Sequence, residues 1–149
     1  MALVDEINND IKVAMKAKAK ETLEALRAVK SALLLAASEK GADGNVSEDA
    51  GILVLQRLVK QRKEAADAYN GQKRSDLADA EMQQASVIET YLPAQLSEEE
   101  VAKIVDDIIT QTGASSMKDM GRVMGMTAQK LAGKADNKLV SNLVKAKLG

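Results

Sequence analysis

Neither cysteine nor histidine occurs among the 149 residues of this chain. Their absence excludes disulfides, thiolate chemistry, the serine–histidine–aspartate triad and the cysteine–histidine pair. It also removes the usual ligands of structural and catalytic zinc. Any catalysis would therefore rest on carboxylates, lysine, tyrosine or a group supplied by a partner. We expect no cofactor and no metal, and no residue is predicted to be catalytic.

Aromatic residues and proline are scarce: the chain has two tyrosines, one proline, and no phenylalanine or tryptophan. Its core must therefore be built from Leu, Ile, Val, Ala and Met side chains. Abundant Ala, Leu, Lys and Glu beside a single proline favour helix throughout. No apolar run reaches the roughly 18 residues of a membrane span, and the first thirty residues are well charged. We therefore expect no signal peptide, no membrane segment and a cytoplasmic location.

Apolar residues recur at helical spacing in seven stretches. These stretches cover residues 3–15, 23–37, 52–69, 77–91, 101–109, 117–124 and 139–148. No stretch alternates apolar and polar residues between hairpin turns, so the predicted fold class is all-α. The clearest helix start is the capping box Ser97-x-x-Glu100, and Gly113 is placed to end the helix that follows.

Other start and stop signals are weaker or more local. Ser47 and Asp136 are expected to be N-caps, and Ser116 with Asp119 offers a weaker cap for the sixth helix. The loop at 41–45, which contains two glycines, an aspartate and an asparagine, is expected to separate the second helix from the third, with its first glycine ending the second helix.

The one proline, Pro93, divides the helices into two groups. The residue before a proline is disfavoured in a helix, so the fourth helix should end by the preceding residue. Four helices precede this point and three follow it. We therefore expect an N-terminal helical subdomain over 1–94 and a C-terminal three-helix subdomain over 95–149.

The C-terminal quarter of the chain is basic, although the whole chain has a formal net charge of −1. Residues 113–149 hold seven basic and two acidic residues, a net charge of +5. A basic, glycine-punctuated segment on an acidic body is typical of a module that binds polyanions. The candidate nucleic-acid contacts are Lys118, Arg122, Lys130, Lys134, Lys138, Lys145 and Lys147. The segment has no aromatic residue, so we expect contacts to phosphates rather than stacking on bases.

Glycines punctuate this basic segment. Gly121 and Gly125 weaken the sixth helix but permit the close approach of a neighbouring backbone. Gly133 and Lys134 form the corner before the last helix, where backbone N–H groups at a helix start are also available to a phosphate. The alternative to a binding surface is a solvated, lysine-rich face that balances the acidic body.

Three further patterns have structural explanations. The basic run at 57–63 is expected to be neutralised within its own helix, with Lys63 pairing with Asp67. Asp106 and Asp107 diverge on a helix and are expected to be solvated without partners. The methionines of the sixth helix are interpreted as core residues, with an adaptable partner groove as the alternative. These are Met117, Met120, Met124 and Met126.

Three motifs resemble those of a known family, the GatB/YqeY family. They are YLPAQLSEEE at 91–100, MKDMGRVMG at 117–125 and GKADNKLV at 133–140. Weaker agreement in the N-terminal half extends the likeness over essentially the whole chain, which is similar to a stand-alone YqeY-like protein. The chain departs from the family pattern at Asn137, where the family usually has glycine. Asparagine tolerates left-handed backbone and also suits a helix start.

The resemblance implies two all-helical subdomains, the larger one first. Related modules form the tail of the B subunit of the tRNA-dependent amidotransferase, or precede some glutaminyl-tRNA synthetases, and hold the outer corner of tRNA while other domains catalyse. The first hypothesis is thus a non-catalytic tRNA-binding accessory module, with a translation-related protein as a further partner. One alternative is a part of, or accessory to, a carbon–nitrogen ligase that uses glutamine as amide donor. A second is a protein-interaction adaptor that docks through its first helix or its methionine-rich helix.

Overall fold

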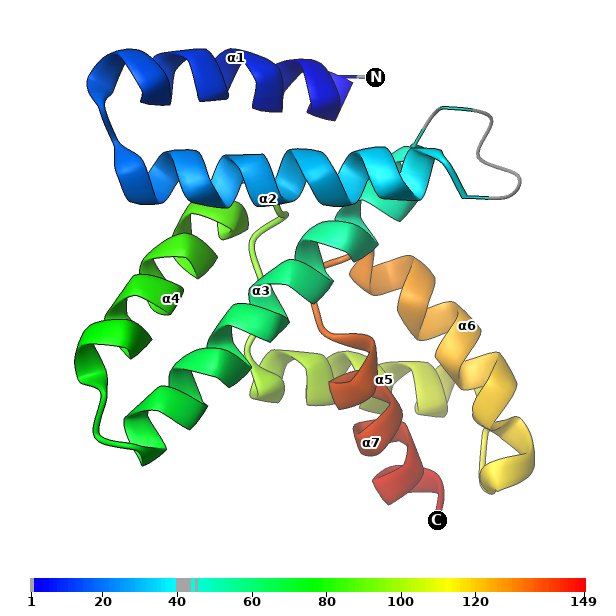
Figure 1. Cartoon of the computed structure of the whole chain (residues 1–149). Coiled ribbons are helices and arrows are strands. Elements are labelled where there is room, and N and C mark those ends of the chain that lie inside the picture. Colours follow the sequence, from blue (N-terminus) through cyan, green and yellow to red (C-terminus); the bar gives the residue numbers. More distant parts are fainter. Residues whose placement is uncertain (1, 40–43, 45) are drawn as a thin grey trace. The chain divides into compact units, whose positions relative to one another are not determined.

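The computed structural model describes residues 2–39, 44 and 46–149, and this part of the chain is helical without any strand, which confirms the all-α class (Figure 1). The helices are α1 (Ala2–Ala17), α2 (Lys20–Ala37), α3 (Glu48–Gly71), α4 (Ser75–Glu89), α5 (Glu98–Thr112), α6 (Met120–Leu131) and α7 (Asn137–Leu148), with a short 3-10 helix η1 (Met117–Asp119) before α6. None of the helices in the described ranges is long and apolar enough to cross a membrane.

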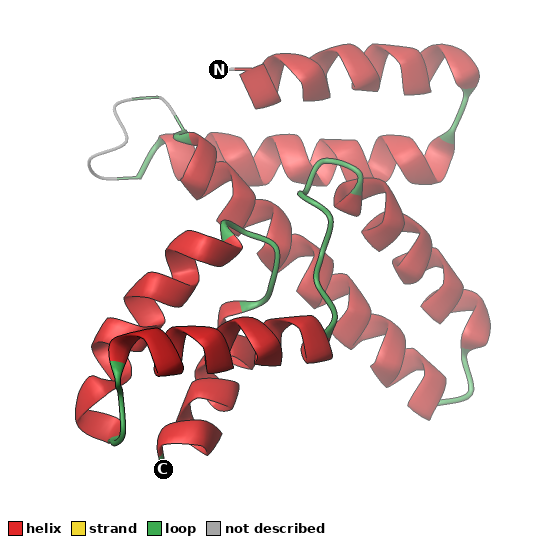
Figure 2. Ribbon diagram, turned by 180° about the vertical axis from the view of Figure 1, so that it is seen from behind, coloured by secondary structure: helices red, strands yellow, loops and turns green. Residues whose placement is uncertain are grey.

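The chain divides into two compact units, Met1–Leu92 and Pro93–Gly149, each with its own aliphatic core. The boundary expected from the sequence, after residue 94, lies two residues further along. In the first unit α1 runs antiparallel to α2, and α3 and α4 form an antiparallel pair that packs on α2 (Figures 1 and 2).

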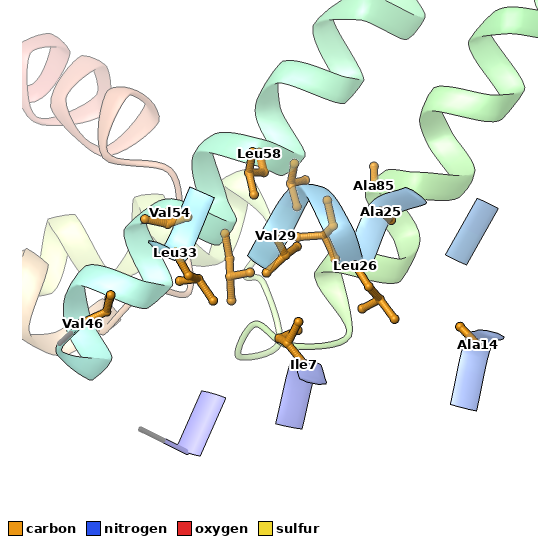
Figure 3. Close-up of a cluster of buried hydrophobic side chains, with 13 residues drawn as sticks. Ile7, Ala14, Ala25, Leu26, Val29, Leu33, Val46, Val54, Leu58 and Ala85 are labelled. Carbon is orange, nitrogen blue, oxygen red and sulfur yellow. The ribbon is translucent and has the colours of Figure 1, made fainter. Parts of the chain in front are cut away.

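The core of the first unit is formed by aliphatic side chains from all four helices (Figure 3). Its largest fully buried members are Ile7, Leu26, Leu33, Leu55 and Ile88. In the second unit α5, α6 and α7 pack on one another, and the buried apolar residues of the unit are Val101, Val105, Ile108, Val123, Leu131, Ala135, Val140, Val144 and Leu148. The aliphatic cores follow directly from the near absence of aromatic residues.

The expected helix ends are confirmed where a short-range hydrogen bond defines them. The hydroxyl of Ser47 accepts from the third backbone N–H after it, and Ser97 with Glu100 forms a complete capping box. Gly113 ends α5 in the left-handed region at φ 69°, and the carboxylate of Asp136 accepts from a backbone N–H in the first turn of α7.

The start of the sixth helix was predicted wrongly. The Ser116 side chain caps nothing there, and η1 precedes α6 instead. The Asp119 carboxylate instead accepts from the Ser115 N–H at 3.1 Å, which closes the loop before η1. A carboxylate three residues after a serine fits both a capping box and this loop, so the sequence pattern does not separate them.

Two other helix ends were assigned to a proline and to a glycine. The fourth helix ends at Glu89, and Thr90, Tyr91 and Leu92 form turns in which each N–H bonds to the carbonyl three residues before it. The second ends at Ala37, so the stop that was assigned to the first glycine of the 41–45 loop lies outside the described residues, as does most of that loop.

Polar contacts join helices of the first unit. Arg62 of α3 donates to the Gln84 side-chain carbonyl at 3.2 Å, and the Gln84 amide donates to Glu24 of α2 at 3.3 Å. Lys63 forms its ion pair with Glu89 of α4 at 2.7 Å rather than with the expected Asp67 on its own helix. Because α3 and α4 lie side by side, a partner across the helix pair is within reach of the lysine.

The second unit begins as extended chain that is tied to the corner between α6 and α7. The Leu96 N–H donates to the Lys134 carbonyl at 2.8 Å, and the Gln95 side-chain amide donates to the Gly133 carbonyl at 2.9 Å. Two of the family-like motifs, at 91–100 and 133–140, therefore contact each other. The sequence alone gave no sign that Gln95 has this role.

The same corner contains backbone strain. Ala132 adopts the left-handed region at φ 45° and ψ 51°, and Gly133 follows with φ 82°. The turn is closed by the Lys134 N–H, which donates to the Leu131 carbonyl at 2.9 Å. A left-handed conformation costs a non-glycine residue about 1 kcal/mol or more, because Cβ approaches the following carbonyl.

Tyr91 links the end of α4 to α1 through a hydrogen bond from its hydroxyl to the carboxylate of Asp10. Burial raises the pKa of the Tyr91 phenol, and the hydrogen bond to Asp10 and the charges of Asp10 and Glu6 raise that pKa further. The folded state therefore favours the neutral phenol.

The Tyr91→Phe substitution is expected to lower the free energy of unfolding by about 1–2 kcal/mol at neutral pH, because a hydrogen bond to a charged acceptor is lost. The raised pKa means that, above about pH 10, the unfolded chain loses the phenol proton before the folded protein does, so the stability of the parent falls with pH. The variant lacks this proton. Urea unfolding of both proteins at neutral pH and near pH 11 measures their free energies of unfolding. The difference between parent and variant should be smaller at the higher pH. A difference that does not change with pH would contradict the hydrogen bond from Tyr91 to Asp10.

The Ala132→Gly substitution is expected to raise the free energy of unfolding by roughly 0.5–1 kcal/mol, because glycine adopts the left-handed region without a Cβ clash. The matched control is Ala128→Gly in the exposed middle of α6, which should destabilise by about 0.5–1 kcal/mol. Chemical denaturation of the three proteins measures both effects. A loss of stability in both variants would show that Ala132 is not strained.

Candidate nucleic-acid interface

The seven basic residues of the 113–149 segment lie on four consecutive elements of the second unit. Lys118 is in η1, Arg122 and Lys130 are in α6, Lys134 is in the corner, and Lys138, Lys145 and Lys147 are in α7. All seven reach the surface. Their side chains differ in whether they already have a partner in the protein.

The Arg122 side chain already has partners at the loop between α5 and α6. Its guanidinium pairs with Asp119 at 3.2 Å and donates to the Thr112 carbonyl at 3.3 Å. The carbonyl lies in the last turn of α5, where a cation also interacts favourably with the helix dipole. Arg122 therefore has a structural explanation, which weakens the case for it as a phosphate contact.

Lys147 is committed to α5 through an ion pair with Asp106 at 2.6 Å, and only 28% of its side chain is exposed. Lys147 is nine positions after Lys138, which places the two on opposite sides of α7. The prediction that Asp106 lacks a partner is therefore wrong. The sequence spacing could not reveal this pair, because the two residues are on different helices.

The other five side chains are exposed and make no hydrogen bond or ion pair within the described ranges. They are Lys118, Lys130, Lys134, Lys138 and Lys145. Lys138 and Lys145 are seven positions apart and so lie on the same side of α7. The last turn of α6, the corner and the first turn of α7 each carry one of these lysines, Lys130, Lys134 and Lys138, so three of the five lie within nine residues of the chain.

The backbone of the corner is largely occupied by the protein itself. The Lys134 N–H and carbonyl bond to Leu131 and Leu96, and the Lys138 N–H donates to the Asp136 carboxylate at 3.5 Å. A carboxylate already occupies the start of α7, where a phosphate was expected to meet backbone N–H groups. The geometry therefore favours lysine ammonium groups over these amides as anion contacts.

Two glycines leave a bare strip on α6. Gly121 and Gly125 are exposed, and apart from the neighbouring residues and backbone of α6 itself no described atom lies within 4 Å of the place where a Cβ would stand on either residue. The neighbouring backbone that these glycines were expected to admit is thus not supplied by the described part of the chain. Exposed glycines inside a helix cost stability without any visible compensation.

Asn137 is the first residue of α7 and does not have a positive φ. The turn before this helix therefore does not need glycine at that position, and the departure from the family pattern causes no strain.

The four methionines of this region differ in burial. Met120 and Met124 pack against the core, whereas Met117 and Met126 are 45% and 38% exposed.

The charges of the second unit are segregated by element. The α5 helix carries Glu98, Glu99, Glu100, Asp106 and Asp107 against one lysine, and the seven basic residues all follow it in the chain. The positive field of η1, α6 and α7 is consequently interrupted by only two carboxylates, those of Asp119 and Asp136.

Comparison with curated proteins gives one partial and two longer similarities. The chain is 36% identical over 96 residues to a protein of Thermococcus gammatolerans, the E subunit of glutamyl-tRNA(Gln) amidotransferase. That match covers 62% of this chain but only 15% of the archaeal protein.

The longer similarities are to fungal proteins named altered inheritance of mitochondria protein 41, mitochondrial. The protein from Pyrenophora tritici-repentis is 24% identical over 99% of this chain and 81% of its own length. The protein from Meyerozyma guilliermondii is 28% identical over 86% of this chain and 68% of its own length. The family described as Yqey-like protein matches residues 4–148. This match spans nearly the whole chain, and the protein therefore belongs to the YqeY-like family.

Proposed function

We propose that this protein is a tRNA-binding accessory module without chemistry of its own, and that its second unit contacts phosphates. The observation that carries the proposal is the set of five exposed lysines, Lys118, Lys130, Lys134, Lys138 and Lys145, whose side chains have no partner in the described part of the chain. The archaeal relative is named as a subunit of glutamyl-tRNA(Gln) amidotransferase, and this name supports tRNA as the polyanion. The lack of histidine and cysteine supports a role in binding.

Lysine contacts to phosphates are driven by the release of counterions and carry no base information. If all five lysines contact phosphates, affinity should fall roughly 10²- to 10³-fold between 50 and 200 mM salt. The absence of aromatic residues from 113–149 leaves shape and backbone contacts as the source of any preference for tRNA over other RNA.

A second candidate function follows from the same relative. The chain would be part of, or an accessory to, an amidotransferase that uses glutamine as amide donor, because it is similar to a segment of such an enzyme. The chain spans 15% of the archaeal protein, so the activity of the whole enzyme is not transferred to it. Stable co-purification with an amidase subunit and glutamine-dependent turnover of the resulting complex would favour this function.

Charge reversal tests the lysine surface directly. The triple variant Lys134→Glu, Lys138→Glu and Lys145→Glu should lose most affinity for bulk tRNA and reduce the slope of log affinity against log salt by about 2–3, since each phosphate contact contributes about 0.7–0.9. Fluorescence anisotropy of labelled tRNA at several salt concentrations measures both quantities.

The matched control reverses three exposed lysines of α1 and α2, Lys12, Lys16 and Lys20, and so changes the net charge equally. It should retain most of the affinity. Equal losses in the two variants would show that binding follows net charge alone. An absence of salt-dependent binding by the parent protein would refute the proposal.

The bare strip on α6 provides a test in which stability and binding change in opposite directions. The double variant Gly121→Ala and Gly125→Ala should raise the free energy of unfolding by about 1–2 kcal/mol, because alanine favours helix and meets open space. We expect it to bind tRNA more weakly, since the added methyl groups hold the RNA backbone away from α6. Thermal unfolding and tRNA titration measure the two effects, and unchanged affinity would remove the glycines from the interface.

A further inference from the structure

The first unit contains a groove between α1 and α4, with α2 as its floor. The groove has a volume of about 370 Å³ and is lined mainly by alkyl groups, among them Val13 and Ala17 of α1, Leu26 of α2 and Val87 of α4. This volume lies within the usual range for a ligand site in a protein. Leu26 extends from α2 toward the part of α1 that carries Ala14 (Figure 3). Val13, at the rim, is 64% exposed.

One end of the groove is acidic. Asp10 lines it and accepts from the Tyr91 hydroxyl through one carboxylate oxygen, and its other oxygen has no partner among the described residues. Glu6 lies one turn earlier on α1 and forms no ion pair within the described ranges. The charges of both carboxylates help to raise the pKa of Tyr91, which places both near the same end. Like charges four residues apart on a helix repel each other, and a cation would relieve that repulsion.

The groove is shaped for a helix. Its lining comes from α1, α2 and α4 and from the turns beside them, and along α1 it follows Asp10, Val13, Ala14 and Ala17. A helix satisfies its own backbone and presents side chains at the spacing of three and four residues. The flank of α1 that carries Glu6, Asp10, Val13 and Ala17 has this same spacing.

We propose that this groove binds an amphipathic helix of a partner protein, with apolar side chains against Val13, Leu26 and Val87 and a lysine or arginine that pairs with Asp10 and Glu6. The charge requirement follows from two carboxylates that have no cation among the described residues, and the helical requirement from the helical spacing of the lining side chains along α1. This binding site is independent of the phosphate contacts proposed for the second unit, and either proposal stands if the other fails.

The test uses the full chain and three synthetic helical peptides of about 18 residues, long enough to be partly helical alone. The first carries a leucine stripe flanked by lysine, the second the same stripe flanked by glutamate, and the third a glutamine stripe flanked by lysine. Methyl NMR spectra should show saturable shifts of the Val13, Leu26 and Val87 signals with the first peptide alone. Shifts of equal size with the second or the third peptide, or none with the first, would overturn the proposal.

Two substitutions locate the contact. Asp10→Asn preserves a hydrogen-bond acceptor for Tyr91 and should lower the affinity for the first peptide roughly 3- to 10-fold, because it removes a negative charge. Ala17→Leu fills the groove from an exposed helical position and should weaken it more than tenfold. Ala68→Leu, at an exposed position of α3 that does not line the groove, should leave affinity unchanged. Equal loss of peptide affinity in Ala17→Leu and Ala68→Leu would overturn the proposal. Shifts of the groove signals that depend on protein concentration alone would also overturn it, because they would identify a second copy of the chain as the occupant.

Discussion

Two hydrogen bonds hold the second unit in the form on which its surface depends. One runs from the Leu96 N–H to the Lys134 carbonyl, and the other from the Gln95 amide to the Gly133 carbonyl. They join the extended entry of the unit to a corner that lies almost forty residues later in the chain. The strained turn at Ala132 brings both carbonyls to the entry segment, so these two hydrogen bonds offset the energetic cost of the strain. Lys134 consequently has a backbone held by two hydrogen bonds and an exposed side chain.

The number of cations that are available for binding depends on which basic side chains form ion pairs in the folded protein. The basic segment has seven cations in the sequence, but Arg122 and Lys147 are bound to carboxylates of the same unit. The surface that remains is smaller than the composition suggests. It is also better defined, because the five lysines that have no partner among the described residues lie on η1, α6, the corner and α7, whereas the acidic residues of the unit concentrate on α5.

The two units present surfaces of different chemistry. The second unit has exposed lysines and a strip without side chains on α6, which suits an extended polyanion. The first has an alkyl-lined groove with an acidic end, which suits an apolar face beside a cation. A chain with almost no aromatic residues builds both from aliphatic helices, and the differences arise at the helix flanks and ends, where polar groups are not covered by the core.

The sequence by itself determined the helical class, the main caps and the family, because these depend on residues within one turn of each other or on short contiguous motifs. Ser47, the Ser97–Glu100 box, Gly113 and Asp136 all act through bonds that span two to four residues. Only the tertiary structure decided that Lys63 pairs with Glu89, that Lys147 pairs with Asp106, and that Tyr91 reaches Asp10. It likewise decided which lysines stay free and where the groove forms. Helical periodicity specifies which face of a helix is buried, but the partner of a flanking side chain depends on how helices cross, and that angle is set by the packing of many side chains at once.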